Sequence, residues 1–167
     1  LADNFGMDAL RMALIVGNTP GNDMSLSEEK VRAYKKFVNK LWNIARFVFE
    51  NTSEADNDIE KTRSPLSERL FIAKDEIGKH IERYQLHLAA ETMYHYIWHD
   101  FADIVIEEIK KTLNNPEADE ATKKAARSLL RSMFTEILKI AHPFMPFVTE
   151  EIWTDMGEKE LLIVAEW

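Results

Sequence analysis

The residues best suited to chemistry in this sequence lie in one stretch, residues 34–47, which reads YKKFVNKLWNIARF. The stretch holds four cations, two amides and no carboxylate, although the 167-residue chain has a formal net charge of -8. Cations bind phosphates, amides hydrogen-bond to base edges, and aromatic rings stack on bases. This combination indicates a surface that binds single-stranded RNA.

Helical geometry would place these groups on one side of a helix. Residues 30–49 contain six cations and no acid. At about 100° per residue, one arc of roughly 120° holds the candidate RNA-binding residues: Lys36, Asn39, Lys40, Asn43, Arg46 and Phe47. The opposite side is apolar and is predicted to face the core. A charged helix face can also be merely solvated, but such faces normally mix both signs for intrahelical pairing. The residues alone leave both interpretations open.

A metal site is the main alternative of another class. His87, Glu91, His95, His99 and Asp103 recur every four residues and would share one helix face. Zinc sites of the His-Glu-x-x-His type need a glutamate directly after the first histidine, and di-iron bundles need Glu-x-x-His. Neither spacing is present, so we predict polar lining between helices and no metal.

A third interpretation is a helical bundle that binds another protein and no RNA. Trp42, Trp98 or Trp153 would dock the partner if they were exposed. At helical spacing these aromatic residues are more often part of a core. A salt-dependent interaction with tRNA would separate this interpretation from RNA binding.

Apolar spacing predicts helices almost throughout the chain. We expect them at about residues 3–16, 27–51, 65–83, 86–113 and 120–141, with a short helix at 147–156. Ser25 and Glu28 resemble a capping box before the second helix, and Pro65 suits the first turn of the third. The last eight residues, ELLIVAEW, are expected to form an extended tail. The predicted fold is an all-α bundle of about five helices.

Composition limits the class of protein. With 46% hydrophobic and 30% charged residues, the chain suits a single globular domain. It has no apolar run near 18 residues, no secretory leader and no cysteine, so we expect no membrane association and a cytoplasmic location. The chain opens at Leu1 and ends at Trp167 in an apolar segment, so we expect a piece of a longer polypeptide.

Four motifs carry a resemblance that covers nearly the whole chain. They are FVNKLWNIARFV at 37–48, GNTPGNDMSLSEEKV at 17–31, YIWHDFADIVIEEIKK at 96–111 and HPFMPFVTEEIW at 142–153. They resemble the anticodon-binding domain of the class I aminoacyl-tRNA synthetases for valine, isoleucine and leucine. The last three are most similar to the valine-specific members, and the isoleucine- or leucine-specific type is the alternative. Ile104 and Val105 depart from a Trp-Tyr pair common in that family.

The resemblance implies a partner, a site and a division of the chain. The partner would be the anticodon stem-loop of a valine tRNA, bound by the matching helix residues Asn39, Lys40, Asn43, Arg46 and Phe47, which the arc derived from helical spacing also contains together with Lys36. Residues 1–26 would connect from a catalytic domain, and residues 27–167 would form the anticodon-binding domain. ATP and Mg would belong to that catalytic domain, because the two ATP-binding signatures of class I synthetases are absent here. We therefore expect no cofactor and no catalysis in these residues, and a monomer.

Overall fold

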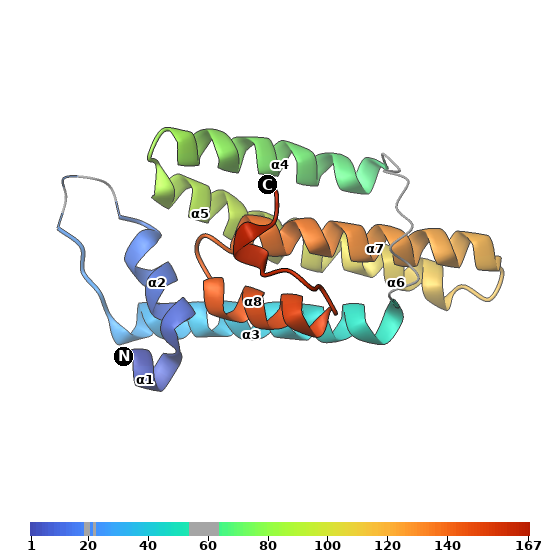
Figure 1. The fold of residues 1–167 in the computed structure, drawn as a ribbon, viewed down its shortest axis with the longest axis horizontal. Helices are drawn as coiled ribbons and strands as arrows, with labels where there is room; N and C mark the ends of the chain where they lie inside the picture. Colours follow the sequence, from blue (N-terminus) through green and yellow to red (C-terminus); the bar gives the residue numbers. More distant parts are fainter. Residues whose placement is uncertain (19–20, 22, 54–63) are drawn as a thin grey trace.

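The protein is described by a computed structural model over residues 1–18, 21, 23–53 and 64–167. The regular structure in these ranges is helical, which confirms the predicted all-α class (Figure 1). The elements are α1 (Ala2–Phe5), α2 (Met7–Ile15), α3 (Glu28–Asn51), α4 (Pro65–Glu82), α5 (Leu86–His95), η2 (Tyr96–Val105), α6 (Ile106–Asn114), α7 (Glu120–Ala141), α8 (Pro146–Asp155) and η3 (Leu162–Val164). None of these helices is both long and apolar enough to cross a bilayer.

The core lies between three long helices and their shorter neighbours. In Figure 1, α3 runs along one side of the bundle, α4 along the other, and α7 lies between them. The apolar side of α3 is buried as its periodicity predicts: Phe37, Leu41, Ala45 and Val48 are all 0% exposed. Among the largest fully buried side chains are four phenylalanines from different segments of the bundle, Phe37, Phe101, Phe134 and Phe144.

Local residue chemistry explains where α3 and α4 begin. The Ser27 hydroxyl accepts a hydrogen bond from the Lys30 amide at 3.1 Å, so Ser27 is the N-cap of α3 and not Ser25. At α4, Ser64 and Ser67 form a reciprocal capping box and Pro65 occupies the first turn, as predicted. Most of the expected loop between these helices, residues 54–63, lies outside the described residues.

The first predicted helix is broken in two. Gly6 has φ +89°, a conformation that glycine adopts without a Cβ clash, and it separates α1 from α2. α2 then packs on α3, α5 and α8, with Ala9, Met12 and Ala13 buried. Its Asp8 carboxylate accepts hydrogen bonds from the amides of Phe147 (3.2 Å) and Val148 (2.7 Å). Asp8 thereby caps α8 and ties α2 to it.

The predicted helix 86–113 is also not uniform. Its middle, Tyr96–Val105, is π-helical, so its backbone bonds run from residue i to i+5. Side chains five apart therefore lie on the same side in η2, where an α-helix would separate them. This change decides which residues of η2 face α3 and which face α4.

The C-terminal tail differs from the expected extended segment. It contains the short 3₁₀-helix η3, with Leu162 buried. The Leu162 amide donates to the Glu150 carboxylate at 2.8 Å, and the Trp153 indole donates to the Glu160 carbonyl at 2.8 Å. These contacts with α8 give the tail a compact form.

An ion-paired glutamate should make the fold sensitive to acid. Glu136 of α7 accepts from Lys74 of α4 at 2.5 Å and from Lys139 at 3.0 Å. Burial alone would raise the pKa of Glu136, but the two lysines outweigh it and the net pKa is lowered. A depressed folded pKa stabilises the protein above the unfolded pKa, and this stabilisation is lost as the pH falls through the folded value.

We therefore expect Glu136→Gln to be less stable than wild type near neutral pH and to lose less stability on acidification. Chemical denaturation from about pH 6 to about pH 3 measures this difference as the free energy of unfolding. Glu151→Gln, which changes an exposed glutamate of α8, should keep the wild-type pH dependence. Parallel curves for wild type and Glu136→Gln would contradict the assignment.

Candidate nucleic-acid interface

Four of the six predicted RNA-binding residues form an open row along α3. Lys36, Asn39, Asn43 and Arg46 are exposed and spaced by three or four residues, so they lie on one side of the helix. Within the part of the chain that the structure describes, their side chains make no hydrogen bond or ion pair. We call these four residues the α3 row. It offers two cations and two amides that are free to bind a ligand.

Lys40, the fifth predicted residue, has internal partners. Its ammonium lies 4.1 Å from the centre of the Trp98 ring and donates to the Trp98 carbonyl and to the Asp103 carboxylate, both at 3.3 Å. Its side chain is only 25% exposed. The π-helical spacing brings Trp98 and Asp103, five residues apart, to the same lysine. Lys40 therefore joins α3 to η2.

Phe47, the sixth predicted residue, is half-buried. Its ring packs against the edge of the core, and the Lys110 ammonium of α6 lies 5.3 Å from the ring centre. Lys110 also forms an ion pair with Glu107 at 2.8 Å. A base that stacks on this side of the ring must displace the lysine.

Aromatic side chains of α3, α5 and η2 meet beside the α3 row. Phe37 lies 4.6 Å from Tyr94 and 6.0 Å from Trp98, and Tyr94 stacks on Trp98 at 5.7 Å. Tyr34 meets Tyr94 edge-on at 6.0 Å. Phe37 is buried, but the other three rings are partly exposed. Burial raises the pKa of both tyrosines, so their hydroxyls stay protonated and can donate hydrogen bonds.

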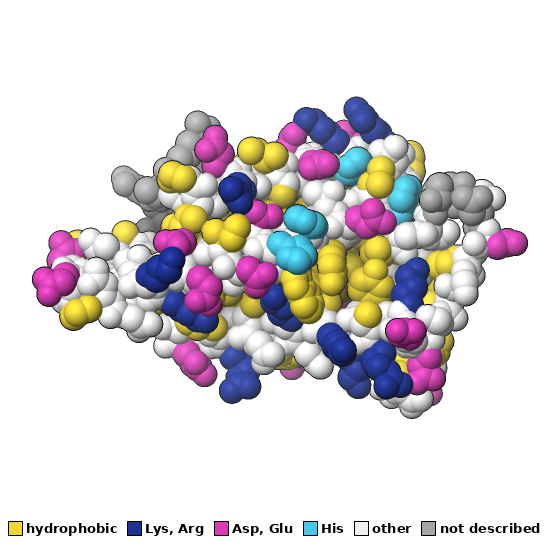
Figure 2. Space-filling model, turned by 180° about the vertical axis from the view of Figure 1, so that it is seen from behind, with side chains coloured by type: hydrophobic (Ala, Val, Ile, Leu, Met, Phe, Trp, Pro, Cys, Tyr) yellow, Lys and Arg dark blue, Asp and Glu magenta, His cyan; other side chains and the backbone are white. Residues whose placement is uncertain are grey.

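The prediction that the polar series from His87 to Asp103 lines the space between helices is wrong for His95 and His99, which are at the surface next to these rings. His95 and His99 are exposed, with ring centres 4.8 Å apart, and Figure 2 shows histidine side chains above an apolar band. His99 lies 3.8 Å from Asp103 and His95 lies 3.9 Å from Asp100. Among the described residues no group of three or more His, Cys, Asp and Glu is arranged to hold a metal ion. The periodicity of this segment does not produce a metal-binding geometry.

Several functional candidates were missed by the sequence pattern. Trp98, expected in the core, is partly exposed under Lys40, and Tyr94 and Lys110 stand beside the predicted face. An α-helical period places residues five apart on different sides of a helix, so it could not predict that Trp98 and Asp103 both contact Lys40. The π-helical turn brings these two residues to the same side. The sequence feature that could have drawn attention to this segment was the recurrence of polar groups every four residues between residues 87 and 103.

The groups on this face are of the kinds that contact single-stranded polyanions in other proteins. The α3 row supplies charge and hydrogen-bonding groups, and the partly exposed rings supply stacking surfaces. Further cations, Arg32 and Lys35, lie at the start of α3 over the Phe5 ring at 5.6 and 5.8 Å. Figure 2 shows basic side chains gathered along this edge of the molecule.

Lys40 and Lys36 should respond differently to the same substitution. We expect Lys40→Met to lower the free energy of unfolding by about 1–2 kcal/mol, because it removes a cation–π interaction and two hydrogen bonds. Lys36→Met should change stability by less than about 0.5 kcal/mol, because that side chain has no partner among the described residues. Urea denaturation of both variants checks this. Equal stability of the two variants would contradict a structural role for Lys40.

Comparison with known proteins adds three findings. A family model described as the anticodon-binding domain of tRNA ligase matches residues 66–167. Valine–tRNA ligases from Geobacillus kaustophilus and Clostridium acetobutylicum are 40% and 36% identical to this chain, each over 99% of it. The chain spans only 19% of the length of each of these relatives.

The fold also recurs in a solved structure. The LeuRS from Agrobacterium radiobacter K84, solved as a ternary complex with tRNA and LeuAMS, aligns with a TM-score of 0.70. The alignment covers 99% of this chain and 20% of that protein, at 18% sequence identity. At this identity the likeness supports the fold alone.

Proposed function

The chain belongs to the family of anticodon-binding domains of tRNA ligases, and from this premise we propose that it binds the anticodon stem-loop of a valine tRNA through α3. The observation that carries the proposal is the α3 row. Lys36 and Arg46 are exposed cations that no acid of the described residues neutralises, in a chain of net charge -8. An acidic protein approaches a polyanion through the part of its surface where cations are concentrated.

Each group in the site has a proposed task. Lys36 and Arg46 contact phosphates, and the planar guanidinium of Arg46 can instead donate two hydrogen bonds to a base edge. Asn39 and Asn43 carry amides that donate to and accept from base edges. Phe47 offers its ring to a base once Lys110 moves aside. Lys40 contributes charge beside the site while it holds α3 on η2.

The remaining assignments follow from the similarity to valine–tRNA ligases. We propose that the chain is part of such an enzyme, in which a separate catalytic domain joins valine to its tRNA with ATP and Mg. Residues 1–26 would lead from that domain, and residues 27–167 would form the RNA-binding unit. We further propose that the protein acts in the cytoplasm and that the 167-residue chain is a monomer.

Titration with short RNA hairpins tests the proposal. Anticodon stem-loops with a valine anticodon and with an unrelated anticodon are bound to the 167-residue chain at several salt concentrations. The expected result is tighter binding of the valine stem-loop, with affinity that falls as salt increases. A preference for isoleucine or leucine stem-loops would reassign the specificity. No RNA binding at low salt would contradict the function and favour a protein-binding surface.

A further inference from the structure

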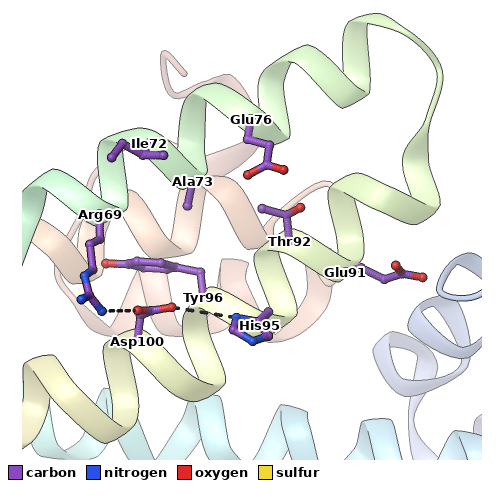
Figure 3. A pocket seen from close by; sticks show the side chains of 9 residues that line it. All are labelled: Arg69, Ile72, Ala73, Glu76, Glu91, Thr92, His95, Tyr96 and Asp100. Carbon is purple, nitrogen blue, oxygen red and sulfur yellow. Dashed lines mark hydrogen bonds and ion pairs between the residues drawn. The ribbon is translucent and has the colours of Figure 1, made fainter.

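A surface hollow between α4 and the α5–η2 segment plays no part in the function proposed above. Its volume is about 500 Å³, within the range of small-molecule sites. It is lined by Arg69, Ile72, Ala73 and Glu76 from α4, and by Glu91, Thr92, His95, Tyr96 and Asp100 from α5–η2. In Figure 3 Glu91 points away from the other side chains, and its carboxylate accepts a hydrogen bond from the Gly17 amide at 3.2 Å. The hollow has an aliphatic wall, an aromatic floor and a polar rim.

A buried hydroxyl without a partner lies in this hollow. Tyr96 is 3% exposed, and its hydroxyl has no hydrogen-bond partner among the described residues. Figure 3 shows the ring lying across the site with its hydroxyl toward Arg69. Burial, and then the Asp100 carboxylate, raises the pKa of this hydroxyl, so it keeps its proton. A buried donor is costly unless an acceptor meets it, which points to a ligand that brings one.

Charge restricts the class of ligand. The lining contains three carboxylates, Glu76, Glu91 and Asp100, against one arginine. Arg69 is already paired with Asp100 at 2.9 Å. A phosphate would be repelled by this excess of negative charge. An ammonium or guanidinium ligand carries donors only, so it would leave the Tyr96 proton without an acceptor. A neutral heterocycle with donors and acceptors on its edge satisfies both conditions.

The hollow is connected to the RNA-binding face by a chain of contacts across η2. His95 lines the hollow, and its ring lies 4.8 Å from that of His99. His99 lies 3.8 Å from Asp103, which in turn pairs with Lys40 of α3 at 3.3 Å. These contacts form a continuous path of side chains from α3 to the rim of the hollow.

We propose that this hollow receives one unpaired nucleobase, and that the side chains covering the buried Tyr96 hydroxyl shift so that it donates a hydrogen bond to an acceptor on the inserted edge. The inference rests on the proposed function, because the RNA bound on α3 is the expected source of the base. A free nucleoside presents the same chemistry and is the other source. Ile72 and Ala73 pack on one side of the base, and the paired Arg69 and Asp100 side chains offer a donor and an acceptor at the rim.

Two variants test the hollow, each with a defined readout. Tyr96→Phe removes only the hydroxyl, and we expect about 2- to 10-fold weaker binding of the valine stem-loop. The same change should leave thermal stability unchanged or raise it, because a buried unpaired polar group is removed. Thr92→Phe fills the hollow from its edge and should weaken binding at least as much. Thr154→Phe makes the same change on the exposed part of α8 and should have no effect.

Two further measurements identify the base and its source. Stem-loops with one abasic site at each loop position are titrated against wild type and Tyr96→Phe. At the position whose base enters the hollow, base removal weakens wild-type binding, and Tyr96→Phe adds no further loss. Adenosine, guanosine, cytidine and uridine are titrated separately by NMR, with the Thr92 and Tyr96 resonances as the readout.

The outcomes separate this proposal from the proposed function. If Tyr96→Phe and Thr92→Phe bind the stem-loop like wild type while α3 variants do not, the hollow is not a base site and the function stands. A second outcome is that no RNA binds but a nucleoside shifts the Thr92 and Tyr96 resonances, and that Tyr96→Phe weakens nucleoside binding. This outcome would contradict the proposed function and support the hollow as a base-binding site. If neither RNA nor any nucleoside reaches the hollow, the inference is overturned.

Discussion

Reversing the two cations of the α3 row that have no ion-pair partner among the described residues, in Lys36→Glu with Arg46→Glu, is expected to weaken binding of the anticodon stem-loop by about 100-fold or more. A hydrogen bond to a charged group contributes roughly 1.5–3 kcal/mol, so removing two phosphate interactions corresponds to about two decades in affinity. Repulsion between the new carboxylates and the RNA weakens binding further. The dependence on salt should also become shallower, by about 0.7 in log–log slope for each phosphate that is no longer neutralised.

A matched variant separates the effect of where the charges lie from the effect of the total net charge. Lys124→Glu with Lys159→Glu makes the same change in charge at two exposed lysines of α7 and the α8–η3 turn, away from α3. We expect this control to weaken binding only slightly. Fluorescence anisotropy at three salt concentrations measures both affinity and slope. Equally weakened binding in the two double variants would mean that RNA responds to total charge and that α3 is not the site.

Replacing Phe47 should reveal whether its ring stacks on a base. A stacked base is worth about 1–3 kcal/mol by alanine substitution, which is roughly 5- to 150-fold in affinity. Because Phe47 is half-buried against the core, Phe47→Ala would also remove packing, and the two effects would mix. Phe47→Leu keeps most of the apolar packing while it removes the ring face.

We therefore expect Phe47→Leu to change the free energy of unfolding by less than about 1.5 kcal/mol and still to lose most of the stacking contribution. The preference for the valine anticodon over an unrelated one should narrow in parallel. Lys110→Met provides the second comparison, because it uncovers the ring and removes a cation at the same place. If Phe47→Leu binds both stem-loops like wild type, the ring is only part of the packing of α3 against the core.

Lys40 shows why a charged face must be examined in three dimensions. Helical spacing depends only on residue number, so it places Lys36, Lys40 and Arg46 on one arc. The structure separates them: Lys40 is held by Trp98 and Asp103 of η2, while the other two cations have no partner within the described residues. We therefore expect Lys40 to contribute mainly to stability and the α3 row mainly to binding.

Neighbouring residues were enough to predict the helical class, the starts of α3 and α4, and the division of α3 into apolar and basic sides. These features depend on local capping and on a period of 3.6 residues, both of which are set within a few positions of the chain. Pro65 marks the start of α4 as predicted, and the buried set from Phe37 to Val48 follows directly from the spacing. The start of α3 lies where it was expected, but its N-cap is Ser27 and not the predicted Ser25.

Which polar groups are free and which are paired depends instead on how the helices pack. The π-helical turn of η2 places Trp98 and Asp103 on Lys40 of α3 and Asp100 on Arg69 of α4, contacts that join residues 31 to 63 positions apart. It also buries the Tyr96 hydroxyl in a hollow between two helices. Such pairings depend on the packing of α3 and α4 on opposite sides of one segment, and no local pattern specifies the distance between groups that far apart in the chain.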